Sequence, residues 1–143
     1  MALTNQYKAK LLDAIYGDTP VNPPATVYVG LSSTTPTQDG TNITEPNGGS
    51  YARVAVTNDG TEWADATVDD PSVKTNINNI EFPESTDEWL SSNEITHAVI
   101  FDSETGGEAI DIAELDFARI VNNPGIILRI LAGEFKSRLR SPQ

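Results

Sequence analysis

The chain has 143 residues, of which 38% are hydrophobic, and a formal net charge of −12. This length suits one domain, residues 1–143, and the excess of acid argues against nucleic-acid binding, because contact with phosphates needs lysine and arginine. No apolar run approaches the roughly 20 residues that span a bilayer, no signal peptide is predicted in residues 1–17, and there is no cysteine for a disulfide or a thiolate metal site.

Residues 3–16 are predicted to form an amphipathic helix. Apolar residues recur every four positions along one face: Leu3, Tyr7, Leu11 and Ile15. Thr4 is placed to cap its start, and Gly17 is placed to end it in the left-handed conformation. The stripe needs burial either on the chain's own sheet or on a neighbouring subunit, and the second alternative makes Leu11 and Ile15 candidate interface residues.

Two strands are predicted on either side of a long polar loop. Residues 26–31 and 51–56 alternate in a period of two, which is typical of strands with one buried face. Residues 32–50, between them, are mostly Ser, Thr, Gly, Asn, Asp and Pro and cannot form a core of their own. A loop of this length in a small domain is usually functional or disordered, so we expect it to contact a partner.

The rest of the chain reads as short strands separated by turns. Turn signals lie at residues 58–60, 104–107 and 122–125, and exposed polar segments at 68–75 and 84–93. Strands are predicted at residues 61–67, 76–82, 95–101, 108–115, 117–121, 126–131 and 134–139. One N-terminal helix and seven to nine short strands favour a mainly β fold, either an antiparallel β-sandwich or a flattened barrel.

The C-terminal segment, residues 134–143, is predicted to be a basic strand or tail. In an extended strand Lys136, Arg138 and Arg140 point the same way, with Phe135 and Leu139 on the opposite face. Residues 13–118 hold 20 of the 21 acids. The ends of one subunit could therefore contact the body of another, which predicts a homo-oligomer; the alternative is an acidic domain whose tail happens to be basic.

No constellation of catalytic residues is visible, so we expect a protein without enzymatic activity and without a cofactor. The single histidine, His97, alternates with apolar residues in a predicted strand and is interpreted as structural. No nucleophile elbow, P-loop or dinucleotide fingerprint is present.

A run of acids in residues 59–70 invites comparison with calcium sites. Its members are Asp59, Glu62, Asp65, Asp69 and Asp70. The run lacks the EF-hand pattern, and solvated loop carboxylates explain it equally well, so no metal site is predicted.

Three aromatic residues have more than one interpretation. Tyr51, Trp63 and Trp89 could stack on sugar rings, since both tryptophans lie in polar surroundings. They could equally be core residues or interface anchors. All three are therefore kept as candidate interface residues.

Three segments carry a resemblance to a known family. They are LTNQYKAKLLDAIYG at 3–17, PATVYVGLSSTTPTQDGTNITEPNGGSYARVAVTN at 24–58, and THAVIFDSETGG at 96–107, of which the block GGSYARVAV is the specific part. They resemble small virion proteins of tailed bacteriophages, described as tail-fibre, minor tail or head-decoration proteins. The final FKSRLRSPQ departs from that pattern.

The resemblance implies a non-enzymatic structural protein, present in many copies on a virion that is assembled in the bacterial cytoplasm. The main expectation is a head-decoration or cement protein bound to the lattice of the major capsid protein. The alternative is a minor tail or tail-fibre component, with Trp63 or Trp89 touching a receptor glycan. The short chain, without heptads or β-helix repeats for a shaft, favours the first.

Overall fold

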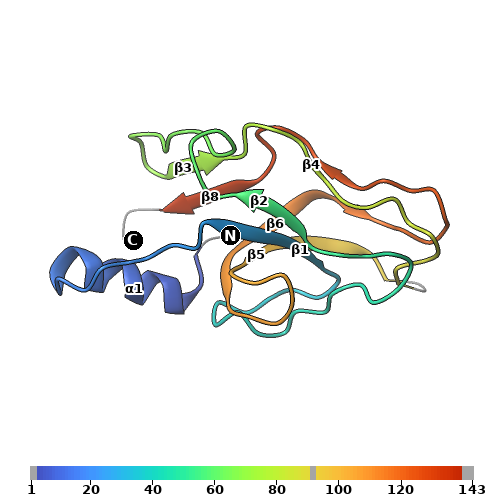
Figure 1. The fold of residues 1–143 in the computed structure, drawn as a ribbon, viewed down its shortest axis with the longest axis horizontal. Helices are drawn as coiled ribbons and strands as arrows, with labels where there is room; N and C mark the ends of the chain where they lie inside the picture. Colours follow the sequence, from blue (N-terminus) through green and yellow to red (C-terminus); the bar gives the residue numbers. More distant parts are fainter. Residues whose placement is uncertain (1–2, 91–92, 140–143) are drawn as a thin grey trace.

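The computed structural model describes residues 3–90 and 93–139 and confirms a mainly β fold with one N-terminal helix (Figure 1). Within these residues eight strands pair in antiparallel sheets. The elements are α1 (Asn5–Tyr16), β1 (Thr26–Ser32), β2 (Val54–Thr57), β3 (Ser72–Thr75), β4 (Ile80–Glu81), β5 (Ile95–Phe101), β6 (Ala109–Arg119), β7 (Arg129–Ile130) and β8 (Lys136–Leu139).

The largest sheet has the strand order β2-β1-β5-β6. Its two central strands, β1 and β5, are buried along most of their length because both faces of the sheet are covered. As predicted, Val27, Val29 and Leu31 share one face and belong to one core cluster.

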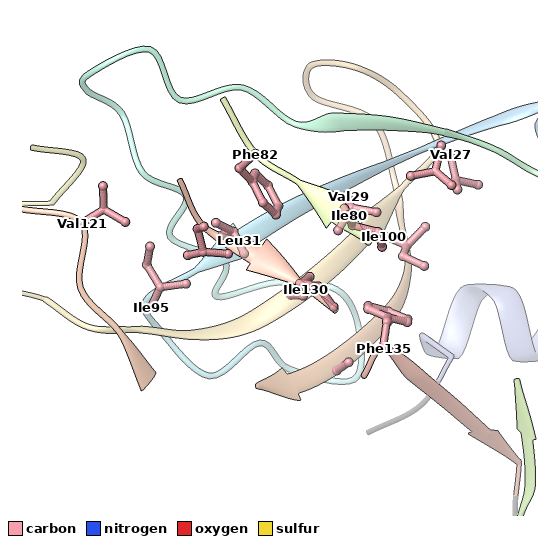
Figure 2. Close-up of a cluster of buried hydrophobic side chains, with 14 of the residues drawn as sticks. Val27, Val29, Leu31, Ile80, Phe82, Ile95, Ile100, Val121, Ile130 and Phe135 are labelled. Atoms are coloured by element: carbon pink, nitrogen blue, oxygen red, sulfur yellow. The ribbon is translucent and has the colours of Figure 1, made fainter. Parts of the chain in front are cut away.

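The first face of this sheet is covered by the short pair β4-β7. Val29 and Leu31 on β1 and Ile100 on β5 pack toward Ile80 on β4 and Ile130 on β7 (Figure 2). This is a two-layer, sandwich-like arrangement. Within the described residues no sheet closes on itself, so the flattened-barrel alternative is not realised.

The second face is covered by the long polar loop. Its Ile43 packs on a second apolar cluster, formed by Val99 and Phe101 on β5 with Ala109 and Ile112 on β6. The loop is also tied to itself by hydrogen bonds, for example from the Thr34 hydroxyl to the carbonyl of Asn42 at 2.6 Å. It therefore forms part of the domain, and its expected contact with a partner stays a prediction.

Several strand predictions differ from the structure. Residues 61–67 do not form a strand. The hairpin turn expected at residues 58–60 does not form, because Gly60 does not take a positive φ. Instead, the backbone N–H and the hydroxyl of Thr61 both donate to the Asp59 carboxylate. Residues 72–75 were predicted as loop but form β3, because they pair with β8. The predicted strands at 108–115 and 117–121 are one continuous strand, β6.

A bulge changes the faces of β5. The sequence predicts Ile95 and His97 on the same face, but the register with β6 shifts between them. Ile95 consequently packs with Ala98 and Ile100 in the first cluster, while Val99 and Phe101 pack in the second.

Helix α1 lies at one end of the molecule beside the sheets (Figure 1), and none of its residues is buried. Thr4 precedes the helix as expected, but its hydroxyl donates to the carbonyl of Ala109 at 2.8 Å instead of capping the helix, which anchors the entry to β6. Gly17 has φ −116°, and the left-handed residue is Asp18, at φ 53°. In the described part of the chain, no helix has the length and apolar character needed to cross a membrane.

Candidate interaction surfaces

The GGSYARVAV block forms a buried polar junction centred on Arg53. The guanidinium binds both carboxylate oxygens of Glu45, at 2.9 and 2.7 Å, and donates to the carbonyls of Ser103 and Gly106, both at 2.8 Å. It also lies 3.4 Å from the centre of the Phe101 ring, a favourable cation–π position. Arg53 thus joins the long loop to the 102–107 turn across the second face of the sheet.

Tyr51 extends this junction into the core. Its hydroxyl donates to Glu45 at 2.8 Å and accepts the backbone N–H of Leu31 at 3.0 Å. Burial, followed by the nearby Glu45 carboxylate, raises the pKa of Tyr51 well above its usual value. The ring packs edge-on against Trp89, with 5.2 Å between ring centroids.

The two glycines of the block allow a close backbone approach. A Cβ on Gly48 would lie 2.6 Å from the carbonyl oxygen of Glu88, and Gly49, at φ +52°, is equally crowded by Asp87. The Gly49 carbonyl accepts the indole N–H of Trp89 at 2.9 Å. The most specific motif of the sequence therefore builds the fold and leaves no open site.

The aromatic candidates are core residues. Trp63 and Trp89 are 7% and 1% exposed, and Tyr51 is half-buried. Trp63 packs edge-on against Phe135, at 5.9 Å between ring centroids. Of the alternatives open from sequence, the core role is the one that the structure shows for this chain, and burial leaves neither tryptophan an exposed ring face on which a sugar could stack.

His97 is also packed inside the domain. It is 5% exposed, its Nδ1 lies 2.8 Å from the Thr96 hydroxyl, and it stands opposite Glu114 in the β5–β6 register. Desolvation lowers its pKa, and the Glu114 carboxylate opposes that shift. This environment is consistent with the predicted structural role.

The acids of residues 59–70 do not gather around a common point. The Asp59 carboxylate accepts two hydrogen bonds from Thr61, and Glu62 accepts one from Asn78. In residues 3–90 and 93–139, no three histidine or acidic side chains are grouped as metal ligands.

The basic C-terminal candidates face the chain's own acids. Lys136 and Arg138, on β8, border a hollow of about 320 Å³ together with Glu114 and Asp116 on β6. Phe135, expected on a partner-binding face, is 2% exposed in the chain's own core. The segment is the last strand of its own sheet, and Arg140 lies outside the described residues.

Helix α1 carries a group of exposed apolar side chains, and others lie outside it, among them Phe117 at 72% and Ile120 at 50% exposed. Leu11, Leu12, Ile15 and Tyr16 are exposed, Ile15 at 61% and Tyr16 at 85%. Of the predicted stripe, Leu3 and Tyr7 are half-buried, so burial on the chain's own body, the first of the two alternatives, is seen only at the start of the helix.

A largely apolar pocket of about 210 Å³ opens at the base of the same helix. Tyr7 borders it, with Val21 and Pro23 from the returning chain and Ile110 and Phe135 from the body. Sequence reasoning missed this pocket because its lining comes from segments spread over the whole chain, and no local pattern links them.

A family model described as "Podophage GP4 fiber I protein gp80" matches residues 2–138. The match continues through most of the C-terminal half, where the resemblance seen in the sequence was limited to 96–107. None of the curated proteins matches the chain.

Proposed function

Because the chain belongs to the podophage GP4 fiber I protein gp80 family, we propose that it is a structural subunit of a podophage tail fibre. The match to that family over residues 2–138 is the observation that carries the proposal. It supports a virion component of a tailed phage, and the word "fiber" in the family description favours the tail alternative over head decoration.

The arrangement of the site is consistent with a structural role. The GGSYARVAV block forms the Arg53–Glu45 junction, and the aromatic candidates Trp63 and Trp89 are in the core. Among the surfaces that the domain offers to other proteins is the exposed apolar side of α1. We assign no catalytic role to His97, whose packing supports a structural function.

The absence of a shaft-forming repeat, which favoured head decoration from sequence, does not oppose this proposal. A fibre can be assembled from several proteins, and a compact β domain can then serve as a base, joint or tip. Attachment would use α1, with Leu11 and Ile15 as contact residues.

The test is to locate the protein on purified phage particles. Gold-labelled antibodies raised against the chain should mark the tail, and quantitative mass spectrometry should give far fewer copies than of the major capsid protein. Label distributed over the head, with a copy number close to that of the major capsid protein, would replace this proposal with head decoration.

A further inference from the structure

The apolar pocket at the base of α1 reaches the hydrophobic core. Val27, Ile100 and Phe135, which are 5%, 7% and 2% exposed, contribute to its lining. In Figure 2 these three side chains lie at the end of the core cluster nearest to α1. The half-buried Tyr7 and Val21 complete the lining on the side of the surface. The pocket is therefore an inlet into the core and not a shallow depression.

The segments that surround the pocket are held in place by the chain's own hydrogen bonds. At the start of α1, the buried hydroxyl of Thr4 donates to the carbonyl of Ala109 at 2.8 Å. At the end of the returning chain, which runs beside α1 in Figure 1, the side-chain amide of Asn58 donates to the carbonyl of Pro24 at 2.9 Å. Because these contacts do not involve a ligand, the pocket is preformed, as small-molecule sites usually are.

The pocket is large for the interior of a small domain. Native interiors are close-packed and leave few voids larger than a water molecule. The volume here is about 210 Å³, and the lining is mainly apolar. An apolar cavity of about 150 Å³ holds benzene, so this pocket has room for one ring with a short substituent.

The charges in the lining favour an uncharged ligand. Lys74 and Asp111 both contribute to the lining, and their formal charges cancel. Both also have partners within the domain, since the Lys74 amino group donates to the carbonyl of Ala64 and an Asp111 oxygen accepts the N–H of Ile112, each at 2.8 Å. An ionised ligand would lose its hydration on entry without gaining a free counter-ion.

Trp63 differs from the other polar residues of the lining. It is 7% exposed and forms part of the wall. Among the buried side-chain nitrogen and oxygen atoms of the lining, its Nε1 is the one without a hydrogen-bond partner in residues 3–90 and 93–139. An unpartnered buried N–H is costly to the fold, and an oxygen brought into the pocket can offset that cost.

We infer that the pocket binds a small, uncharged and mainly apolar molecule of about one ring, which carries an oxygen that accepts a hydrogen bond from the Trp63 indole. The apolar body of the ligand packs against Val27, Ile100 and Phe135, which removes its surface from water. Because Nε1 is shielded by its neighbours, the oxygen must displace one of them, and the hydrogen bond should add only about two- to tenfold in affinity. The inference does not rest on the proposed place of the chain in a tail fibre.

Nuclear magnetic resonance on the purified wild-type chain tests where the ligand binds, with acetophenone as the probe. A molecule of this size should bind with a dissociation constant of about 1 μM to 1 mM. The indole N–H signal of Trp63 should shift in a saturable way, whereas that of Trp89, which already donates to Gly49 and is not in the lining, should not. The methyl signals of Ile110, in the lining, should shift more than those of Ile112, two residues along the same strand and outside it.

Two outcomes of that titration would overturn the inference. One is the absence of a saturable shift at Trp63 and Ile110 up to the solubility limit of acetophenone. The other is a set of shifts confined to Leu11 and Ile15, which would show that the probe adheres to the exposed side of α1 and does not enter the pocket.

A second experiment isolates the hydrogen bond. Ethylbenzene matches acetophenone in shape and lacks the oxygen, and Trp63→Phe keeps an aromatic wall and lacks the donor. The ratio of the affinities for the two ligands should fall by about two- to tenfold from wild type to Trp63→Phe, because this comparison cancels their different hydration. The Trp89 indole signal of the variant shows whether its core stays folded. An unchanged ratio, or tighter binding of the benzoate anion than of acetophenone by wild type, would contradict the inference.

Discussion

Arg53 and Glu45 form a two-point ion pair that closes the long loop onto the sheet, with N–O distances of 2.9 and 2.7 Å. The Arg53 side chain is only 7% exposed and Glu45 is 26% exposed. Paired and hydrogen-bonded in this way, the buried guanidinium makes four hydrogen bonds, two to the carboxylate and two to backbone carbonyls.

Replacing Glu45 with Gln should destabilise the domain, because it leaves the buried charge of Arg53 without its counter-ion. We expect a loss of about 2–3 kcal/mol in the free energy of unfolding, somewhat below the value for fully buried pairs because Glu45 is partly solvated. Glu81→Gln is the matched control: its pair with Arg129 is about half exposed and should contribute no more than about 1 kcal/mol. Equal losses for the two variants in urea denaturation would contradict this role.

Gly30 should not tolerate a methyl group. A Cβ there would lie 2.8 Å from a Glu45 carboxylate oxygen, 2.9 Å from the Phe101 ring and 3.2 Å from the Tyr51 hydroxyl. Gly30→Ala should therefore cost about 1–3 kcal/mol through overpacking. Gly60→Ala, which meets nothing within 4 Å, should leave stability unchanged or raise it by up to about 1 kcal/mol. The melting temperature of each variant is the measurement. A Gly30→Ala protein as stable as wild type would show that the junction has room for a methyl group.

The parts of the fold that sequence predicted are those with a local cause. Residues 26–31 and 95–101 alternate or are continuously apolar, and they became the two central strands. Strand β3 carries no such pattern: Ser72–Thr75 is a strand because Val73 pairs with Arg138, a partner far along the chain. Pairing of this kind is set by the tertiary fold and cannot be read from a short window.

The candidate surfaces also divide into features with a local sequence pattern and features set by the tertiary fold. The helix and its apolar stripe were predictable, since a period of four residues is local. The burial of Trp63 was not predictable, because its neighbours in sequence are polar turn residues while it packs against Phe135, which is far along the chain. The surroundings of Lys136 and Arg138 could not be predicted for a similar reason, because their acidic neighbours Glu114 and Asp116 are on a different strand.

His97 should make stability depend on pH below neutrality. Its pKa is lowered in the folded state, mainly by desolvation, so the unfolded chain binds a proton at a higher pH than the folded domain does. Stability from this residue is present above the ordinary pKa of about 6.5 and is lost as pH falls from there toward the lowered folded-state pKa. His97→Asn should flatten the stability profile in this window. If His97→Asn and wild type show the same pH dependence of the free energy of unfolding between pH 7 and 5, this prediction is wrong.

Asp111 should make stability depend on pH in the opposite sense to His97. Its carboxyl is 3% exposed on β6 at the edge of the apolar pocket, and one oxygen accepts the backbone N–H of Ile112 at 2.8 Å. Burial is the main cause that raises its pKa, and hydrogen bonding to Ser137 opposes the shift. The folded domain therefore holds this proton at pH values where the unfolded chain has lost it.

The contribution of Asp111 to stability is thus greatest in acid and is lost as pH rises from the ordinary value of 3.8 through the raised folded-state pKa. Asp111→Asn keeps the shape and the acceptor without the ionisation, so its stability relative to wild type should increase from pH 4 to pH 7. Asp116→Asn, on an exposed position of the same strand, controls for the removal of one negative charge from a chain with a net charge of −12. Chemical denaturation of the three proteins at both pH values provides the measurement. If the difference between Asp111→Asn and wild type is the same at pH 4 and pH 7, the carboxyl group does not ionise at a cost to the fold.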